Sequence, residues 1–382
     1  MLDESLLDAP QKLARADSRG LLRGAAESGA RVRTSARSAT EAGVADLRPE
    51  GRPRALFVAG SGPDTGSVTD LLSAFVGSNV PVGLISPTGA LAAPGALLWS
   101  LPGWAGPADL MLVVTSDGTE PGLTGLVDQA YRRGCAIVAV TPGGSPLTGE
   151  VKSRHGLAIP LASVLYEQPA EGNRPYGESE HPGLLWAMLT PLLAVIDRMG
   201  LVSAPPDVLQ RVADRLDRVA ERCGPAVATY SNSAKTLAAE LADALPLLWS
   251  EGPAAGAAAR RFAHVLASVA GRPALTAGLP EALMLHNTLL SGVFAAGADP
   301  EDFFRDRVEE PEALHARVVL LRDRSAGGRS ASPAARELAL SHDTPVSELE
   351  AAEGSPLEAV AELLAVADFT AVYLALASRE RT

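Results

Sequence analysis

Short, uninterrupted apolar runs alternate with stretches of helical spacing along most of the chain. The apolar runs occupy residues 55–60, 82–87, 110–115 and 136–141, and the pattern restarts at residues 226–231, 246–250 and 317–321. Runs without polar alternation are typical of strands buried on both faces of a parallel sheet. The alternation therefore predicts the α/β class, with helices on both sides of each sheet.

The helical stretches set the expected organisation. In the second part of the chain they cover residues 184–199, 205–223, 234–244, 254–270, 280–290 and 356–377. The first of them contains Thr190-Pro191 and is apolar enough to be a buried helix. We predict leading helices over residues 1–50, a first doubly wound parallel sheet within residues 51–200, and a second within residues 201–382.

Composition excludes several classes of function. The chain has 382 residues, 47% of them hydrophobic, and a net charge of −12, which is ordinary for a globular protein and unfavourable for nucleic acid or an anionic membrane surface. Its two cysteines cannot form a disulfide framework, so we expect a cytoplasmic protein. The histidines show no metal-ligand spacing, so no metal is expected.

Two loops at predicted strand ends carry candidate anion-binding residues. The first contains Gly66 and Ser67 just before a helix expected to begin near Val68. The second is rich in hydroxyl groups and comprises Thr115, Ser116, Asp117, Gly118 and Thr119. A helix N-terminus with hydroxyl donors can hold a phosphate, whereas Asp117 would repel one if it pointed inward. Ordinary turns, with Ser67 or Asp117 as helix caps, remain the alternative.

The second half offers candidate acid–base groups. Glu281, His286 and Asn287 follow Pro280 closely, and a histidine near neutrality can transfer a proton. Lys235 opens a predicted helix after Asn232, where a lysine is more often a solvated surface group than a ligand.

Together these segments resemble the bifunctional phosphoglucose/phosphomannose isomerases, which are built from tandem sugar isomerase (SIS) halves. The resemblance covers residues 54–377 and rests on the Gly66-Ser67 loop, the hydroxyl-rich second loop, residues 232–238, Pro280-Glu281 ahead of His286-Asn287, and residues 368–375. It implies aldose–ketose isomerisation of a hexose phosphate without metal or cofactor, by a homodimer with sites at the interface. It also implies phosphate binding at the two loops and a ring-opening role for His286.

The chain departs from that family at several catalytic positions. Ser268 stands where the family has the glutamate that moves the proton between C1 and C2, and no lysine follows Lys235. The second loop is one residue shorter, and Asp117 lies at or beside a phosphate-binding serine. An expected Pro-Arg pair is missing after Pro160, unless Arg174-Pro175 replaces it.

Two functions follow from this combination. One is a phosphosugar isomerase with a rearranged site, in which Glu281 or Glu251 acts as base and His286 keeps its role. The other is a catalytically silent protein that binds a phosphosugar or a partner as a sensor or structural component. A serine hydroxyl without an adjacent base cannot remove a carbon-bound proton, so the residue chemistry favours the second function and the resemblance favours the first.

Overall fold

The computed structural model of the protein describes residues 2–47, 51–60, 62, 64–89, 97–161, 181–291, 315–323 and 330–378. The chain forms two compact units. One unit comprises residues 27–214, and the other combines residues 1–26 with residues 215–382. The N-terminal residues expected to form one segment are therefore divided between the units, with the break after Ala26.

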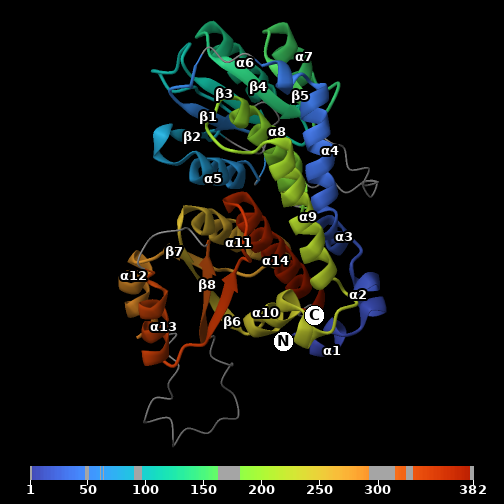
Figure 1. The fold of residues 1–382 in the computed structure, drawn as a ribbon, viewed down its shortest axis with the longest axis vertical. Helices are drawn as coiled ribbons and strands as arrows, with labels where there is room; N and C mark the ends of the chain where they lie inside the picture. Colours follow the sequence, from blue (N-terminus) through green and yellow to red (C-terminus); the bar gives the residue numbers. More distant parts are fainter. Residues whose placement is uncertain are drawn as a thin grey trace, which may run out of the picture. The chain divides into compact units, whose positions relative to one another are not determined.

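The unit of residues 27–214 is built on a five-stranded parallel sheet (Figure 1). The strand order is β2-β1-β3-β4-β5. The strands are β1 (Leu56–Ala59), β2 (Val82–Ile85), β3 (Leu110–Val114), β4 (Ala136–Thr141) and β5 (Leu157–Pro160). Every residue of β1 and β3 is buried, as their uninterrupted apolar runs predicted.

Helices cover both faces of this sheet. Helices α6 (Pro121–Arg132) and α7 (Pro146–Ser153) enclose one apolar core with it, while α5 (Asp64–Val76), α8 (Leu184–Arg198) and α4 (Ser28–Glu41) pack on the other side. Short 3-10 turns lie at η1 (Val44–Asp46) and η2 (Gly77–Asn79). Helix α8 is a buried helix that contains Pro191, as predicted.

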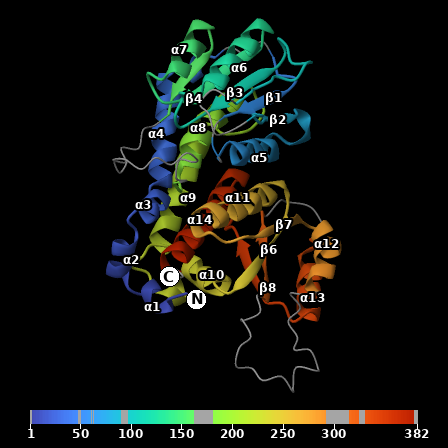
Figure 2. The ribbon, with the colours of Figure 1, turned by 180° about the vertical axis from the view of Figure 1, so that it is seen from behind.

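The other unit is built on a four-stranded parallel sheet of order β7-β6-β8-β9 (Figure 2). Its strands are β6 (Ala244–Glu251), β7 (Leu275–Gly278), β8 (His315–Arg322) and β9 (Val346–Glu350). Helices α12 (Glu281–Leu290) and α13 (Ser332–Ser341) pack on one face. Helices α10 (Ser233–Leu241), α11 (Pro253–Ala270) and α14 (Pro356–Ala377) form the other layer. The two parallel-sheet halves thus confirm the predicted fold class.

Helix α14 is the central helix of this second unit. Its length and apolar composition would suffice to cross a membrane, but almost all of its side chains are buried inside the unit, which is typical of a core helix. The helices α1 (Glu4–Leu7), α2 (Pro10–Ala16) and α3 (Leu21–Ala26) contact α14. The backbone N–H of Asp3 donates to the carbonyl of Ala377 at 2.8 Å.

The predicted strand at residues 226–231 was wrong. Residues 229–231 form the 3-10 turn η3 (Thr229–Ser231), between α9 (Pro206–Arg222) and α10. The backbone groups of this segment bond to side chains instead of a neighbouring strand. The Asp8 carboxylate accepts from the N–H of Thr229 at 2.8 Å, and the Lys235 ammonium donates to the carbonyl of Val227 at 2.7 Å. Both partners lie outside the predicted strand, so its apolar composition could not reveal them.

Candidate functional site

Each parallel sheet has one point where the chain changes winding direction, and ligands of α/β proteins usually bind there, beyond the carboxyl ends of the strands. In the five-stranded sheet this switch point lies between β1 and β3. The loops that follow these two strands are the two predicted phosphate loops. The sheet therefore places both loops at the same edge, because β1 and β3 are parallel neighbours.

The first loop does not have the expected form. Helix α5 begins at Asp64, not near Val68, so Gly66 and Ser67 are the third and fourth residues of the helix. Asp64 is buried in the first turn, where its carboxylate interacts favourably with the helix dipole, and Ser67 is also buried. Ser67 is consequently not the residue that caps α5. Ser61 and Pro63 of this loop lie outside the described residues.

The second loop folds into a turn closed by its own hydroxyl groups. The Oγ1 atom of the buried Thr115 accepts from the N–H of Asp117 at 3.3 Å and from the N–H of Gly118 at 3.2 Å. The Thr119 hydroxyl donates to the exposed Asp117 carboxylate. Three polar groups that could have served an anion therefore bond within the loop itself.

The cap of the following helix is Glu120, not Asp117. Its carboxylate accepts from the N–H of Gly122 at 3.1 Å. Two carboxylates, Asp117 and Glu120, thus lie within four residues at the start of α6. Glu120 occupies the region where the dipole of α6 is positive, which is also where a phosphate would bind, and Asp117 precedes it in the loop.

Gly118 shows how closely this loop packs on its neighbour. Its φ is +72°, and a Cβ there would lie 2.5 Å from Oγ1 of Thr141 and 2.6 Å from Oγ of Ser145. Those two hydroxyls are 3.1 Å apart, and Ser145 caps α7 by accepting from the N–H of Thr148. Only glycine combines this backbone conformation with this approach.

At the switch point of the four-stranded sheet, between β6 and β8, two carboxylates cap helices reciprocally. Asp323, just after β8, accepts from the N–H groups of Ala254 and Ala255 at 3.1 and 3.2 Å, at the start of α11. Glu251, the last residue of β6, accepts from the N–H of Ala331 and the hydroxyl of Ser332, at the start of α13. Asp323 at the end of β8 therefore caps α11, the helix that follows β6. Glu251 at the end of β6 caps α13, a helix that follows β8.

These bonds determine the ionisation of Glu251. Burial disfavours the charged carboxylate, but hydrogen bonds from Ser332, Ala331, Ser330 and Arg322 outweigh it and hold the pKa of Glu251 below its ordinary value. A carboxylate with a lowered pKa and four donors is a weak base. Glu251 is consequently a poor replacement for the missing catalytic glutamate.

His286 is buried and held by a single strong contact. The indole Nε1–H of Trp249 on β6 donates to Nδ1 of His286 at 2.6 Å, which leaves the ring proton on Nε2. Burial lowers the pKa of His286, so the ring is neutral at physiological pH. Its neighbour Asn287 is hydrogen-bonded to His342 through Oδ1 at 3.1 Å.

The other candidate acid–base residues lie on different helical faces. Glu281 is exposed in the first turn of α12, five residues before His286. Side chains five residues apart do not share a helix face, so α12 does not bring these two together. Ser268 is exposed in the last turn of α11. Arg174, the possible replacement for the missing arginine, lies outside the described residues.

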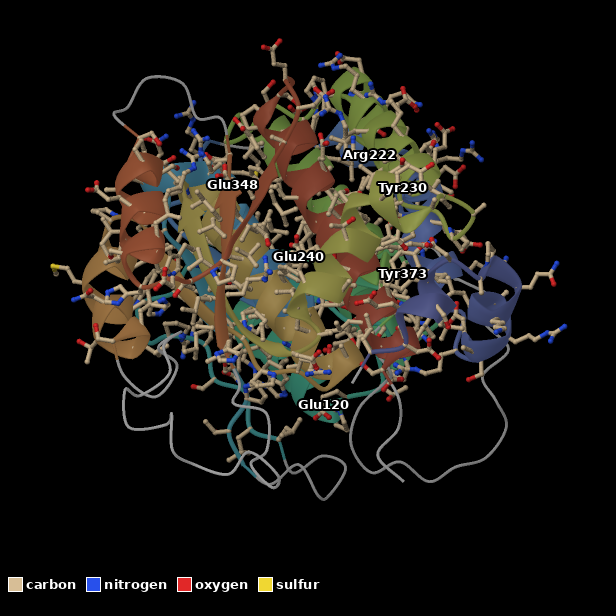
Figure 3. All side chains as sticks on the ribbon, turned by 90° about the horizontal axis from the view of Figure 1, so that it is seen from below. Glu120, Arg222, Tyr230, Glu240, Glu348 and Tyr373 are labelled. Carbon is tan, nitrogen blue, oxygen red and sulfur yellow. The ribbon has the colours of Figure 1, made fainter. Side chains whose placement is uncertain are left out.

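Lys235 belongs to the core rather than to the surface. It is fully buried, and its ammonium donates to the carbonyls of Pro225 and Val227 at 2.8 and 2.7 Å. Burial lowers its pKa, although the Asp8 charge opposes the shift. Tyr373 lies on α14 (Figure 3), and its ring centroid is 5.4 Å from the ammonium. Burial raises the pKa of the Tyr373 hydroxyl. Both hydrogen bonds tie α10 to the preceding loop.

Sequence reasoning missed Asp323, Trp249 and Glu120, which define the chemistry of these loops. Asp323 and Glu120 each follow closely after an apolar run, and the strand-end rule that selected the other loops could have found them. Trp249 has no such signal, because it looks like any other buried aromatic residue of a strand. Among the residues that the structure describes, no group of His, Cys, Asp and Glu could hold a metal.

Comparison with known proteins identifies the architecture. Residues 230–379 match the family model described as the bacterial phospho-glucose isomerase C-terminal SIS domain. The fold is of the tandem SIS type. No curated protein matches the sequence.

Three solved structures share this SIS architecture along nearly the whole chain. A candidate phosphosugar isomerase from Silicibacter pomeroyi DSS-3 is 15% identical, with a TM-score of 0.56 over 92% of this chain and 95% of that one. The tagatose-6-phosphate ketose/aldose isomerase from Escherichia coli is 15% identical, with a TM-score of 0.52 over 96% and 92%. The C-terminal domain of glucosamine-fructose-6-phosphate aminotransferase from Francisella tularensis is 12% identical, with a TM-score of 0.53 over 93% and 95%.

Proposed function

We propose that this chain is a catalytically silent SIS protein that acts by binding, as a sensor or structural partner. The observation that carries the proposal is the state of its candidate bases. Glu251 is held ionised by four donors, Glu281 lies on another face of α12 from His286, and Ser268 is an exposed hydroxyl. Aldose–ketose isomerisation needs a base that removes a carbon-bound proton, and none of these groups is suited to do so.

A weakened glucose 6-phosphate or mannose 6-phosphate isomerase is the second candidate. One observation favours it: Trp249 fixes the orientation and tautomer of His286, as a ring-opening histidine would require. The match of residues 230–379 to an isomerase domain covers this histidine. In this candidate Glu281 supplies the base, and the rate is low because the carboxylate is exposed.

A coupled assay for fructose 6-phosphate formation distinguishes the two functions. Glucose 6-phosphate and mannose 6-phosphate are each supplied to the wild type and to the variants His286→Ala and Glu281→Gln. We expect no product above the background without enzyme in any of the three proteins. Product formation by the wild type that is abolished by either substitution would establish the isomerase and overturn the silent role.

The names of the structural relatives support a hexose phosphate as the ligand class to examine first. The proposal also includes a homodimer, which the resemblance of the sequence implies, and a cytoplasmic location, which the cysteine content predicts. Analytical ultracentrifugation of the full chain measures the assembly directly. A monomer at micromolar concentration would remove the dimer from the proposal without affecting the assay of turnover.

A further inference from the structure

The two outer edges of the four-stranded sheet differ in charge. In a parallel strand, alternate residues bond to one neighbour, and the backbone groups of the residues between them point to the other side. The N–H of Val318 on β8 donates to the carbonyl of Pro345 at 3.0 Å. Glu348 and Glu350 therefore turn their backbone groups toward the outer edge of β9, and both carry exposed carboxylates. Charged side chains at an edge discourage another strand from pairing with it.

The edge formed by β7 has no such protection. The N–H of Leu279 donates to the carbonyl of Ser250 on β6 at 2.8 Å. By the same alternation, the exposed residues Thr276 and Gly278 turn their N–H and C=O groups to the outer side of β7, which we name the free edge. Strand β7 contains no charged residue, and no strand of the described part of the chain pairs with it on this side. Such an edge can pair with a further strand.

Helix α12 presents an apolar side chain beside the free edge. Figure 1 and Figure 2 show α12 beside α13 from opposite sides, and Asn287 of α12 bonds to His342 at the end of α13. Successive residues of an α-helix are rotated by about 100°, so Leu285 lies about 160° around α12 from Asn287, on the flank away from α13. Glu281, four residues before Leu285, lies on the same flank. Because α12 also contacts β7, this flank borders the free edge, and Leu285 is 64% exposed there.

Opposite charges flank β7 symmetrically. Arg272 lies three residues before the strand, and Glu281 lies three residues after it. Neither side chain has an ion-pair partner in the part of the chain that the structure describes. If a second copy of β7 pairs antiparallel about Ala277, Arg272 of each copy approaches Glu281 of the other. Parallel pairing of two copies would bring like charges together instead, so the charges favour the antiparallel direction.

We infer that the free edge of β7 and the adjoining flank of α12 form the interface of the homodimer, with the two β7 strands antiparallel. The inference rests on the homodimer included in the proposed function and names the surface that forms it. Thr276 faces the partner's Gly278, and these residues exchange N–H···O=C bonds. A two-fold axis perpendicular to the sheet keeps both α12 helices on one face, so Leu285 packs against the partner's α12. The ion pairs at the two ends supply local attraction between copies that each have a net charge of −12.

Exchange of the flanking charges tests this arrangement. Arg272→Glu gives each copy two carboxylates at the interface, and Glu281→Arg gives each copy two guanidinium groups. Each variant alone should raise the Kd of the dimer about 10–100-fold, because like charges then meet at both ends of β7. Sedimentation of the full chain over a concentration series measures this Kd. An equimolar mixture of the two variants should form a heterodimer with nearly the wild-type Kd, since opposite charges meet again at both ends.

Two matched pairs of variants test the backbone and the helix flank. The N–H of Thr276 is not used by β6, so Thr276→Pro removes a donor only at the free edge and should weaken the dimer, whereas Thr276→Val keeps the N–H and should not. Leu285→Lys should also weaken it. Leu340→Lys changes an exposed leucine on α13 and should have no effect. Where thermal unfolding shows that the proline variant is not folded, the charge variants decide.

The outcomes separate this inference from the proposed function. A dimer whose Kd is unchanged in Arg272→Glu and Glu281→Arg, or a mixture of the two that does not associate, overturns the interface and leaves the homodimer standing. Equal weakening by Leu285→Lys and Leu340→Lys would also contradict it. A monomeric wild type overturns both the interface and the homodimer. The assay of fructose 6-phosphate formation tests the catalytically silent role separately from all of these results.

Discussion

Single residues determine whether the candidate groups of this protein can take part in acid–base chemistry. His286 is the clearest case, because one contact sets its tautomer and burial sets its charge. Protonation of Nδ1 would break the hydrogen bond from Trp249 and place a charge in an apolar core. The folded state therefore resists protonation of this ring.

The titration of His286 can be followed by NMR of its ring Cε1–H group. Because burial lowers the pKa of the folded state, we expect a midpoint below the ordinary value of 6.5. The unfolded chain then binds more protons as the pH falls below 6.5, so this group makes the folded protein less stable in that range and not above it. In Trp249→Phe the indole donor is lost, and the midpoint should move upward. A wild-type midpoint at or above 6.5 would contradict this account.

The sequence alone indicated which side chains could transfer protons, but it did not indicate which groups they hydrogen-bond to. His286 was selected because histidine is a proton-transfer group, and this required no structure. Its partner Trp249 is 37 residues away on a strand, and only the fold brings the two together. The cap of α6 shows the same limit, since aspartate is the preferred N-cap type, yet the turn closed by Thr115 places Glu120 at the cap.

At the scale of elements, the reciprocal caps of α11 and α13 explain how two βα units hold each other at the switch point. Strands β6 and β8 pair in parallel over eight residues, which brings Glu251 opposite Arg322 and next to Asp323. Each carboxylate then reaches the helix that follows the other strand. A helix cap of this kind typically contributes about 1 kcal/mol to stability.

Removal of the Asp323 carboxylate should therefore weaken the folded state. We expect Asp323→Ala to lower the free energy of unfolding by about 0.5–2 kcal/mol, because the N–H groups of Ala254 and Ala255 lose their acceptor. Asp323→Asn retains an acceptor oxygen and should lose less. Urea denaturation measures both variants. Equal stability of Asp323→Ala and the wild type would show that this cap contributes nothing.

The elements were predicted with uneven success for a physical reason. Uninterrupted apolar runs and long helices, such as β3, β4 and α14, can be recognised from the local sequence alone. The strands β7 and β9 were not predicted, because polar residues interrupt their apolar sequences: Thr276 in β7, and Ser347, Glu348 and Glu350 in β9. The false strand at residues 226–231 has an apolar sequence but bonds to Asp8 and Lys235 instead.

At the scale of the whole molecule, the N-terminus completes a unit whose remaining residues begin about 190 positions later. Helices α1, α2 and α3 contact α14, and their buried side chains include Leu7, Leu13 and Leu21. The Asp8 carboxylate binds the N–H and the hydroxyl of Thr229 at 2.8 and 2.9 Å. Folding of this unit therefore requires contacts between the two ends of the chain, which form slowly because they are distant in sequence.

Because the unit needs its N-terminal helices, replacing Leu13 should destabilise it strongly, although Leu13 lies near the N-terminus. Leu13 is fully buried on α2, so Leu13→Ala should cost about 2–5 kcal/mol, as is usual for a buried leucine. Gln11→Ala changes an exposed residue of the same helix and should stay within about 0.5 kcal/mol of the wild type.

Hydrogen exchange of the backbone amides shows which helices lose stability in Leu13→Ala. Amides of α14 should exchange faster in Leu13→Ala, since α2 packs on that helix, whereas amides of α8 belong to the other unit and should keep their protection. Unchanged protection of α14 would mean that the N-terminal helices lie on this unit without stabilising it.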